Sequence, residues 1–489
     1  MAGMASSAAT VPSLLVALRR APEGRKRRGR VATGLVTIAV RTLPDVRLGR
    51  RLQQLVDALS RHAKAALGTA LPVWAARKAA YRFFDHNQLN AALILDAARP
   101  LVVERVAAAT GVVLAIQDTT SLNFSHRPAT SGLGPLGPTA AQGFYVHSCL
   151  AVDAERGLPL GLLAQQLWAR EPLRVRQTRR KRLAGAKESR RWTDVEAASL
   201  AGLPETVPVL SVADREGDVF AWFAATRPDN AYLLVRVAQT GRSTSAGTSV
   251  LGAAQAAPVG GHYTVAIPHA PNRPPRTARC RVRWTTLTLQ PPRNGRREPG
   301  QRRSVELTVL LVEEETPPAG GTPLQWLLLT SWPVASWEAA ARVVWWYTLR
   351  WLVERYHYVL KTGCQVEALQ LQTEARLERA VAVYCLVAVQ VLWLTYLGRE
   401  QPELPCELAL DRDSWQALWQ VSSPREPLPQ TPPPLGQAMR RVAMLGGFLG
   451  RKGDGDPGPL TVWRGMDRLH DIVFGYRLAR GLPTEPTYG

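Results

Sequence analysis

Residues 347–361 carry four polar side chains at the spacing of one helical face. The segment reads YTLRWLVERYHYVLK. At about 100° per residue, Arg350, Glu354 and Lys361 fall roughly 60°, 20° and 40° from Tyr347, all to the same side. The opposite side of this helix is apolar and consists of Leu349, Val353, Tyr356 and Leu360. We therefore predict one helix with an apolar back for packing and a narrow polar front, which is either a solvated face or part of a site.

Two aspartates close apolar runs that predict buried strands. Asp118 ends GVVLAIQD at 111–118, and Asp214 ends VPVLSVAD at 207–214. Ligands bind at the carboxyl ends of strands in α/β sheets, and a helix packed beside those ends can add Glu354 as a third carboxylate. Each acid alone carries little information, because a strand-end aspartate commonly caps the helix that follows.

Together, Asp118, Asp214 and Glu354 form a candidate metal site. Carboxylates that converge in a region of low dielectric repel one another, so they need a cation between them. Oxygen ligands without Cys or His favour Mg²⁺, with Mn²⁺ as a substitute. Two such ions about 3.5–4 Å apart can activate a water or a 3′-hydroxyl and stabilise the leaving oxygen of a phosphodiester. We interpret Glu216 and Asp218, which follow the second strand, as helix-start acids favoured by the helix dipole and not as ligands.

The elements that must position these acids divide the chain into four parts. Residues 1–44 include the basic tract RKRRGR and predict a disordered tail. Residues 45–98 show helical periodicity and several arginines that could face phosphates. Residues 99–373 alternate strands, a hairpin and helices, and the stretch from about 231 to 331 is mostly β. Residues 374–489 are helical again. A sheet of strand, hairpin and strand with a helix that carries the third acid is an RNase H-like arrangement.

The composition points to a polyanionic partner. The 489 residues include 61 Lys+Arg against 39 Asp+Glu, a net charge of +22, and the sequence pI is about 10.6. A surplus of this size favours nucleic acid, although arginine-rich proteins of other classes share it. The five cysteines are far apart and odd in number, which argues against a disulfide framework or a zinc site and fits a reducing cytoplasm.

One apolar run, Ala380 to Gly398, is nearly long enough to span a membrane. It is interrupted by Gln390, stands alone and follows a polar amphipathic segment. We therefore favour a buried core helix over a membrane span. No apolar stretch followed by a cleavage site opens the chain, so we expect no signal peptide and a cytoplasmic protein.

These motifs give the chain a residue-specific resemblance to a known family. It resembles the DDE transposases of the bacterial insertion-sequence-four (IS-four) family, the group that includes Tn-five transposase. AIQDTTSL contains the first Asp with its Thr-Thr-Ser, and ADREGD contains the second. Tyr347-x2-Arg350-x3-Glu354-x6-Lys361 is the complete YREK signature of that group. The β strands between the second Asp and the Glu also fit.

The resemblance implies a fold and a division of labour among the domains. It implies an α/β protein whose RNase H-like catalytic core, 99–373, carries an inserted β subdomain at about 231–331. A helical domain at 45–98 would bind transposon ends, and a helical domain at 374–489 would dimerise. The partners would be double-stranded DNA, both transposon ends and target, and a second copy of the chain in the synaptic complex, with no membrane involved.

The resemblance also assigns roles to individual residues. It implies that Asp118, Asp214 and Glu354 hold two Mg²⁺ ions. The residues implied to contact DNA are Tyr347, Arg350, Lys361, Trp326, Trp351, Arg51 and Arg82, of which Trp326 would stack on a flipped base and Trp351 could assist.

Two departures from the family pattern concern the grip on DNA. Tyr358 stands where the group has a further lysine. Ser125 stands where it has an arginine, with Arg127 a candidate substitute.

The expected activity is cut-and-paste transposition. The protein would nick the end of its element to free a 3′-OH, form and reopen a hairpin, and join the 3′ ends to target DNA. Two alternatives stay open: a metal nuclease that hydrolyses without joining, and a transposase-derived DNA-binding protein without catalysis. The base-stacking tryptophan argues against the first, and three intact acids argue against the second.

Overall fold

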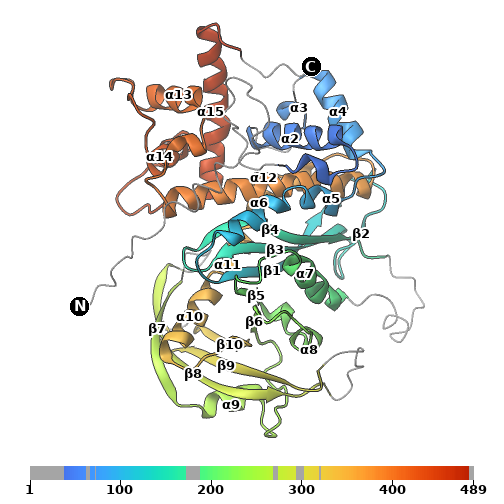
Figure 1. Ribbon diagram of the computed structural model, residues 1–489, viewed down its shortest axis with the longest axis vertical. Coiled ribbons are helices and arrows are strands. Elements are labelled where there is room, and N and C mark those ends of the chain that lie inside the picture. Colours follow the sequence, from blue (N-terminus) through green and yellow to red (C-terminus); the bar gives the residue numbers. More distant parts are fainter. Residues whose placement is uncertain are drawn as a thin grey trace.

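The computed structural model describes residues 38–61, 67–71, 73–171, 188–267, 274–292, 302–318 and 321–483. Most of the predicted basic tail and the basic segment 172–187 lie outside these ranges. The described chain is a mixed α/β structure in which a large sheet lies below one long helix and two groups of shorter helices lie above it (Figure 1).

The sheet has ten strands in the order β2-β3-β1-β5-β6-β10-β9-β8-β7, with β4 paired to β3. Its first part consists of β1 (Val113–Asn123), β2 (Gly134–Pro135), β3 (Gln142–Asp153), β4 (Leu158–Trp168), β5 (Val209–Ala213) and β6 (Ala231–Arg236). The predicted hairpin is β3 and β4, which pair antiparallel, as do β1 and β3. By contrast, β1, β5 and β6 run parallel. Burial of the first five residues of β1 and of all of β5 explains the continuous apolar runs that predicted these two strands.

The strand-rich stretch from 231 to 331 continues this sheet. The structure corrects the expected start of the β insertion, because β6 is the parallel neighbour of β5 and belongs to the central part of the sheet. The antiparallel strands that extend the sheet are β7 (Val259–Ile267), β8 (Arg276–Leu289), β9 (Val305–Glu314) and β10 (Gln325–Thr330). A second hydrophobic core lies against this part, where α8 (Phe220–Phe223) and α9 (Val250–Ala256) cover it.

The N-terminal helices form a module around one amphipathic helix. Its elements are η1 (Val40–Thr42), α2 (Val46–Arg61), α3 (Leu67–Ala70), α4 (Trp74–Phe84), α5 (Ala91–Asp96) and α6 (Arg99–Ala107). Helix α2 buries Leu52, Leu55 and Leu59 at helical spacing, as its sequence predicts. Further along, η3 (Glu188–Arg190) leads into α7 (Arg191–Leu200), and α7 lies against β3 and β4.

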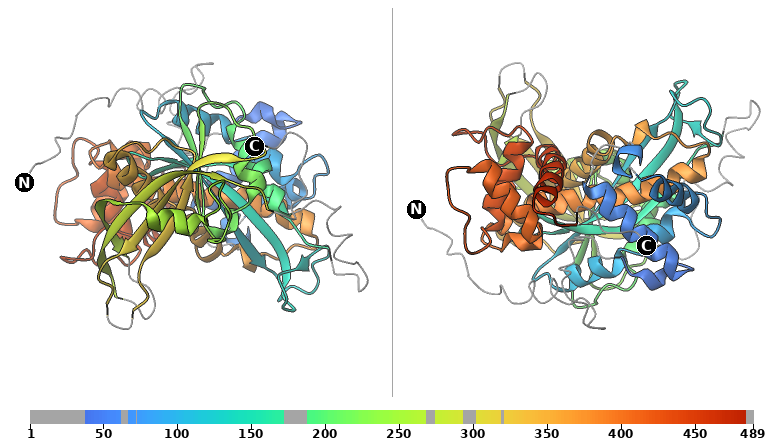
Figure 2. Two further views of the ribbon diagram at one scale, coloured as in Figure 1. Left: turned by 90° about the horizontal axis from the view of Figure 1, so that it is seen from below. Right: turned by 90° about the horizontal axis from the view of Figure 1, so that it is seen from above.

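The apolar run at 380–398 lies in α12 (Glu374–Glu400), and an 18-residue window of this helix is wholly buried inside the protein. Helix α12 contacts β4 on one side and α2, α5, α14 and α15 on others. Burial therefore accounts for its apolar character, as expected of a core helix. Seen from above, the N-terminal and C-terminal helices lie over different halves of α12 (Figure 2).

The C-terminal helices pack on one another beyond α12. They are η7 (Cys406–Leu408), α13 (Arg412–Ser422), α14 (Leu435–Leu445) and α15 (Pro459–Ala479). Each of the longer three has an apolar face that the other two cover.

The single helix predicted over 347–361 is interrupted. Helix α10 (Trp337–Thr348) ends one residue after Tyr347, and α11 (Trp351–Tyr358) begins one residue after Arg350. Backbone bonds of the tighter i to i−3 kind join the two, from the amides of Leu349 and Arg350. A π-helical turn, η5 (Val359–Gly363), contains Lys361, and a short 3-10 turn, η6 (Val366–Ala368), follows. The apolar back is nevertheless buried as predicted.

Candidate active site

Asp118 lies where the parallel pairing of β1 ends. Strand β1 does not stop at Asp118 as predicted but continues to Asn123, because β3 pairs with it along the whole length. Its other neighbour, β5, pairs only as far as Ile116 opposite Val212. Asp118 therefore projects from the edge left by the shorter strand, and its side chain is 17% exposed.

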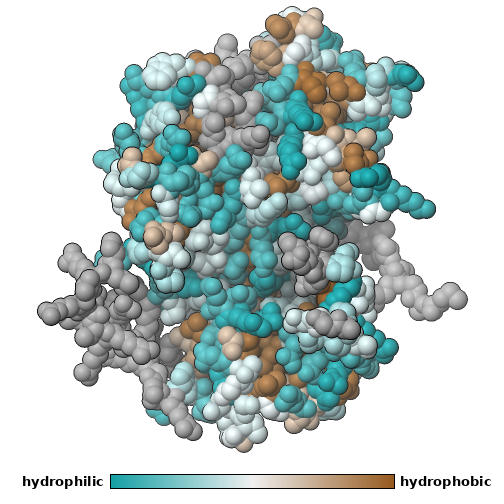
Figure 3. Space-filling view, turned by 180° about the vertical axis from the view of Figure 1, so that it is seen from behind, coloured by the Kyte–Doolittle hydropathy of each residue, from teal (hydrophilic) through white to brown (hydrophobic). Residues whose placement is uncertain are grey.

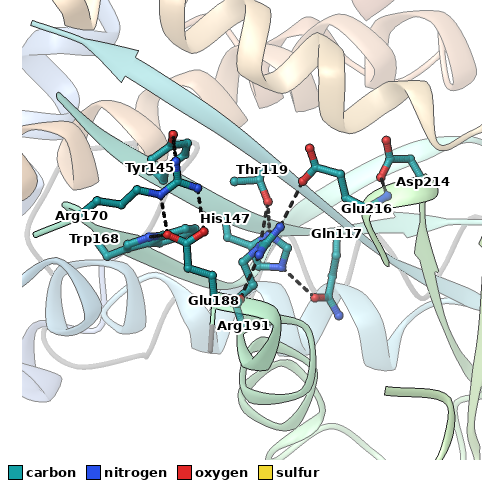
Figure 4. A network of polar contacts seen from close by, with 10 residues as sticks. All are labelled: Gln117, Thr119, Tyr145, His147, Trp168, Arg170, Glu188, Arg191, Asp214 and Glu216. Carbon is teal, nitrogen blue, oxygen red and sulfur yellow. Dashed lines mark hydrogen bonds and ion pairs between the residues drawn. The ribbon is translucent and has the colours of Figure 1, made fainter. Parts of the chain in front are cut away.

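Asp214 follows β5 directly and caps the short helix η4 (Arg215–Gly217). Its carboxylate accepts a hydrogen bond from the backbone N–H of Glu216 at 2.8 Å. The Glu216 carboxylate in turn pairs with Arg191 at 3.1 Å (Figure 4). Burial raises the pKa of Glu216, as do the charges of Asp214 and Asp118, while Arg191 lowers it. The two aspartates thus lie close enough to act on the same carboxylate.

Glu354 is in the first turn of α11, 55% exposed, and forms an ion pair with Arg350. Burial tends to lower the pKa of Arg350, but Tyr347, Glu354 and Asp118 outweigh burial and raise it. Arg350 therefore pairs with the third acid and is also stabilised in its charged form by the first. In the part of the chain that the structure describes, no group of three or more His, Cys, Asp or Glu is arranged to hold a metal ion.

Tyr347 packs against the aromatic residue predicted to stack on a base. It is buried, its hydroxyl interacts with Arg236, and burial raises its pKa, as does Asp214. The half-buried Trp326 packs edge-to-face on Tyr347, with ring centroids 5.1 Å apart. The Nζ of Lys361 donates to the carbonyl oxygen of Ser121 on β1 at 3.0 Å. The structure thus gathers the YREK residues and Trp326 around the ends of β1 and β5.

The other residues predicted to contact DNA lie elsewhere. Trp351 is on the side of α11 that faces α12, 6.4 Å from the Tyr396 ring, with Arg355 over its own ring. Arg51 on α2 is half-buried and Arg82 on α4 is exposed. Both belong to the helices above α12, on the other side of that helix from the sheet (Figure 1).

The departures and neighbouring acids have local roles. The Ser125 hydroxyl bonds Asn123 and accepts the N–H of Gln142, and Arg127 donates to the carbonyl oxygen of Ala368. Tyr358 is exposed.

Asp218 is not a helix-start acid, which corrects our interpretation. It is buried, pairs with Arg242 at 2.9 Å and accepts two backbone N–H groups, from Ala238 and Gln239. Glu216 does lie in the first turn of η4, as interpreted, and its carboxylate pairs with Arg191.

A polar network supports β1 from the face opposite Asp118. His147 is buried and bonds Thr119 at 2.8 Å and Gln117 at 3.0 Å (Figure 4). The Arg191 guanidinium donates to Thr119 and to the carbonyl oxygen of Glu188. Burial, with the nearby charge of Arg191, keeps the pKa of His147 well below its ordinary value.

Three residues near the acids escaped sequence reasoning. Arg191 lies in a long basic run that gives no sign of a special position. Arg236 is on a strand whose periodicity only indicates burial. His357 had a usable signal, because it follows Glu354 by three residues on a helix and therefore lies on the same side.

Comparisons with known proteins match the two ends of the chain. Residues 37–89 match a family described as transposase DNA-binding, and residues 386–485 match the transposase Tn5 dimerisation domain. Among solved structures, a match covers 97% of this chain and 78% of a chain in the cryo-EM structure of the piggyBac transposase synaptic complex with hairpin DNA, at 9% identity and a TM-score of 0.35. The DNA-binding match covers α2 and α4, and the dimerisation match covers the C-terminal helices. These two domain matches support a Tn5-like transposase.

Proposed function

We propose that this transposase is a DDE enzyme that cuts its element at the terminal inverted repeats and joins the 3′ ends to target DNA, with Asp118, Asp214 and Glu354 as the catalytic acids. The observation that carries the proposal is the arrangement around Arg350. Arg350 forms an ion pair with Glu354 and its pKa is also raised by Asp118, while the pKa of Tyr347, the first residue of the motif, is raised by Asp214.

The sheet supports an RNase H-like core. Strands β4, β3 and β1 are antiparallel neighbours, and β1, β5 and β6 are parallel neighbours, so the central order is β4-β3-β1-β5-β6. The first two acids lie at the ends of the adjacent strands β1 and β5, and the third comes from the helix packed beside them. This is the placement that an α/β sheet gives to ligand-binding residues.

The donor set fits Mg²⁺ or Mn²⁺ in its chemistry, because all three acids offer oxygen. The raised pKa of Glu216 reflects, after burial, the negative charge that Asp118 and Asp214 place there. Two such ions would be held by these three acids and would supply Lewis-acid activation of the attacking oxygen and stabilisation of the leaving oxygen. In the structure Glu354 is engaged by Arg350, so it must exchange this partner to join the other two acids.

The remaining residues would bind and orient DNA. Arg350 and Lys361 offer charged donors for phosphates beside the acids. Trp326, held against Tyr347, offers a partly exposed aromatic face to an extruded base. Arg51 and Arg82 carry positive charge on the helices that match the transposase DNA-binding family. A homodimer would bring two ends together through the C-terminal helices.

The decisive change is Glu354→Gln, which keeps the size of the side chain and removes its charge. We expect end binding to stay within about twofold and nicking in Mg²⁺ to fall ~1,000-fold or more, since loss of one ligand of a two-metal site costs several kcal/mol of transition-state stabilisation. Glu338→Gln is the matched control, because Glu338 is an exposed first-turn glutamate of α10.

Nicking of supercoiled DNA that carries one end measures this directly. If the Glu354→Gln variant nicks DNA near the wild-type rate, Glu354 is not one of the catalytic acids. Joining of a pre-cut 3′-OH end by the wild-type protein separates the transposase from the two alternatives. A nuclease would cut and not join, and a DNA-binding descendant would do neither.

A further inference from the structure

Asp118 begins a row of polar side chains that crosses three strands. In the antiparallel pairing, Asp118 lies opposite Ser148 on β3, and Ser148 lies opposite Gln165 on β4. Residues directly opposite in adjacent antiparallel strands project to the same face. Helix α11 covers this face and places His357 and Tyr356 over the row.

Side-chain hydrogen bonds join the members of this row. The Gln165 amide nitrogen donates to the Ser148 hydroxyl at 2.8 Å and to the Tyr356 hydroxyl at 3.2 Å. The Tyr356 hydroxyl interacts with the thiol of Cys385 in α12. Nδ1 of His357 faces a carboxylate oxygen of Asp118 at 3.5 Å, and because a carboxylate only accepts, Nδ1 carries the imidazole proton. The other nitrogen, Nε2, then accepts from the Ser148 hydroxyl, 3.1 Å away.

We propose that His357 is a positioning residue for Asp118, with the Gln165–Ser148 row fixing the imidazole so that its Nδ1–H holds one carboxylate oxygen and leaves the other for the site. Within the described ranges, His357 is the side chain that forms a close pair with the Asp118 carboxylate. The imidazole has little freedom, since its side chain is 7% exposed and Ser148 is fully buried.

A fixed donor matters because a carboxylate on a strand edge can rotate. A donor bound to one oxygen selects the rotamer, which lowers the entropy cost of bringing the other oxygen to a cation. The inference rests on the proposed metal-binding role of Asp118. It adds that α12, through Cys385 and Tyr356, is connected to the orientation of that acid.

Two substitutions of His357 distinguish the role of Nδ1 from the role of Nε2. The amide nitrogen of His357→Asn lies near the position of Nδ1 and keeps a donor for Asp118. His357→Gln places its amide near Nε2 and keeps only the bond to Ser148. His147→Gln is the matched control. His147 is also a buried histidine and directly precedes Ser148 on β3, but its side chain lies on the opposite face of the sheet.

The measurement is Mn²⁺ binding to the full chain without DNA, followed by the electron paramagnetic resonance signal of free Mn²⁺. We expect His357→Gln to weaken Mn²⁺ binding roughly 10–100-fold, as for other residues that orient metal ligands, and His357→Asn to recover most of the loss. The Mn²⁺ concentration that gives half-maximal nicking should rise in His357→Gln as Mn²⁺ binding weakens, while the nicking rate at saturating Mn²⁺ changes less. Melting temperatures of all variants show whether each is folded.

Equal Mn²⁺ affinity in His357→Gln and wild type, or equal losses in the Gln and Asn variants, would overturn the positioning role. Asp118→Asn separates this failure from failure of the proposed function. If Asp118→Asn abolishes Mn²⁺ binding and His357→Gln does not change it, only the positioning role is wrong. If Asp118→Asn binds Mn²⁺ as wild type does, the assignment of the acid itself is wrong.

Discussion

At the scale of single residues, Arg350 explains how carboxylates can lie near one another at one edge of the sheet. Its guanidinium pairs with Glu354, and its pKa is raised against the effect of burial by Tyr347, Glu354 and Asp118. The positive charge lowers the repulsion among carboxylates at the strand edge. In the proposed function, the Arg350 guanidinium also binds a DNA phosphate. Because the same guanidinium pairs with Glu354, DNA binding and the release of Glu354 are linked.

The spacing of the motif predicted which of its residues share one side of the helix, but it did not predict the side-chain contacts at the site. Tyr347, Arg350 and Glu354 share one side because both turns of the interrupted helix remain right-handed. Spacing could not indicate that Glu216 pairs with Arg191, since the two come from separate elements and meet only through the sheet. Such contacts depend on the tertiary arrangement, which local periodicity does not encode.

Trp326 allows a prediction that separates two chemical steps. A hairpin requires a very tight turn of DNA, and extruding a base relieves its strain at a cost of a few kcal/mol. Stacking on an aromatic face recovers about 1–3 kcal/mol, which is roughly 5–150-fold in rate. We expect Trp326→Ala to slow hairpin formation by this factor and nicking by less than about threefold. Time courses of nicked and hairpin products on a labelled end measure both steps.

An abasic site at the extruded position should restore part of the hairpin rate, because the strain is already relieved. Trp284→Ala is the matched control, since Trp284 is also half-buried in the sheet and packs on another tryptophan, Trp337. Equal slowing of both steps without rescue by the abasic site would make Trp326 a packing residue of β10.

At the scale of elements, the sequence predicted the kinds of structure better than their ends. The apolar runs before Asp118 and Asp214 are strands, and the hairpin is β3 and β4. The end of β1 was wrong by five residues, because β3 continues to pair with it after β5 has stopped. The helix break near Leu349 was missed, since no glycine or proline marks it.

Helix α12 shows a further limit of sequence reasoning and gives a prediction about pH. Burial raises the pKa of Glu378 in its second turn to about 7, and Glu374 contributes in the same direction while Arg379 opposes it. The pKa in the folded state exceeds the ordinary value of 4.5, so the folded state binds more protons between these values. Stability therefore falls as pH rises from about 4.5 to about 7, and the loss is complete above that range.

Glu378→Gln removes the buried charge without changing its size. We expect the variant to be more stable than wild type at pH 8, by about 1–2 kcal/mol after allowance for partial exposure, and equal to it at pH 4. Melting temperatures at both pH values test this, with the exposed Glu403→Gln as control. A gain that is the same at pH 4 and pH 8 would show that charge is not its cause.

At the scale of the whole molecule, α12 joins the parts that sequence analysis separated. We placed the start of the dimerisation domain at residue 374, but α12 packs on β4, α2 and α5 as well as on the C-terminal helices. A chain cut at residue 373 would uncover the N-terminal helices and the sheet together. A test of dimerisation therefore requires substitutions at the surface rather than truncation.

The surface of the C-terminal helices offers such positions. Hydrophobic side chains reach the surface over the upper part of the molecule, where these helices lie (Figure 3). Phe474 and Leu478 are 45% and 65% exposed and lie one turn apart on α15. Large apolar side chains that gather at the surface commonly mark protein contacts, and this segment matches the Tn5 transposase dimerisation domain.

The double substitution Phe474→Ser and Leu478→Ser leaves the net charge unchanged, so electrostatic binding to DNA should be preserved. We expect complexes with one DNA end to form as in wild type and paired-end complexes to fall at least ~10-fold, since two desolvated side chains per protomer contribute a few kcal/mol to a symmetric contact. Native gels with labelled ends of two lengths distinguish the complexes. Val259→Ser, on the exposed edge strand β7 at the far end of the molecule, is the control. Paired-end complexes at the wild-type level in the double variant would place the dimer contact on another surface.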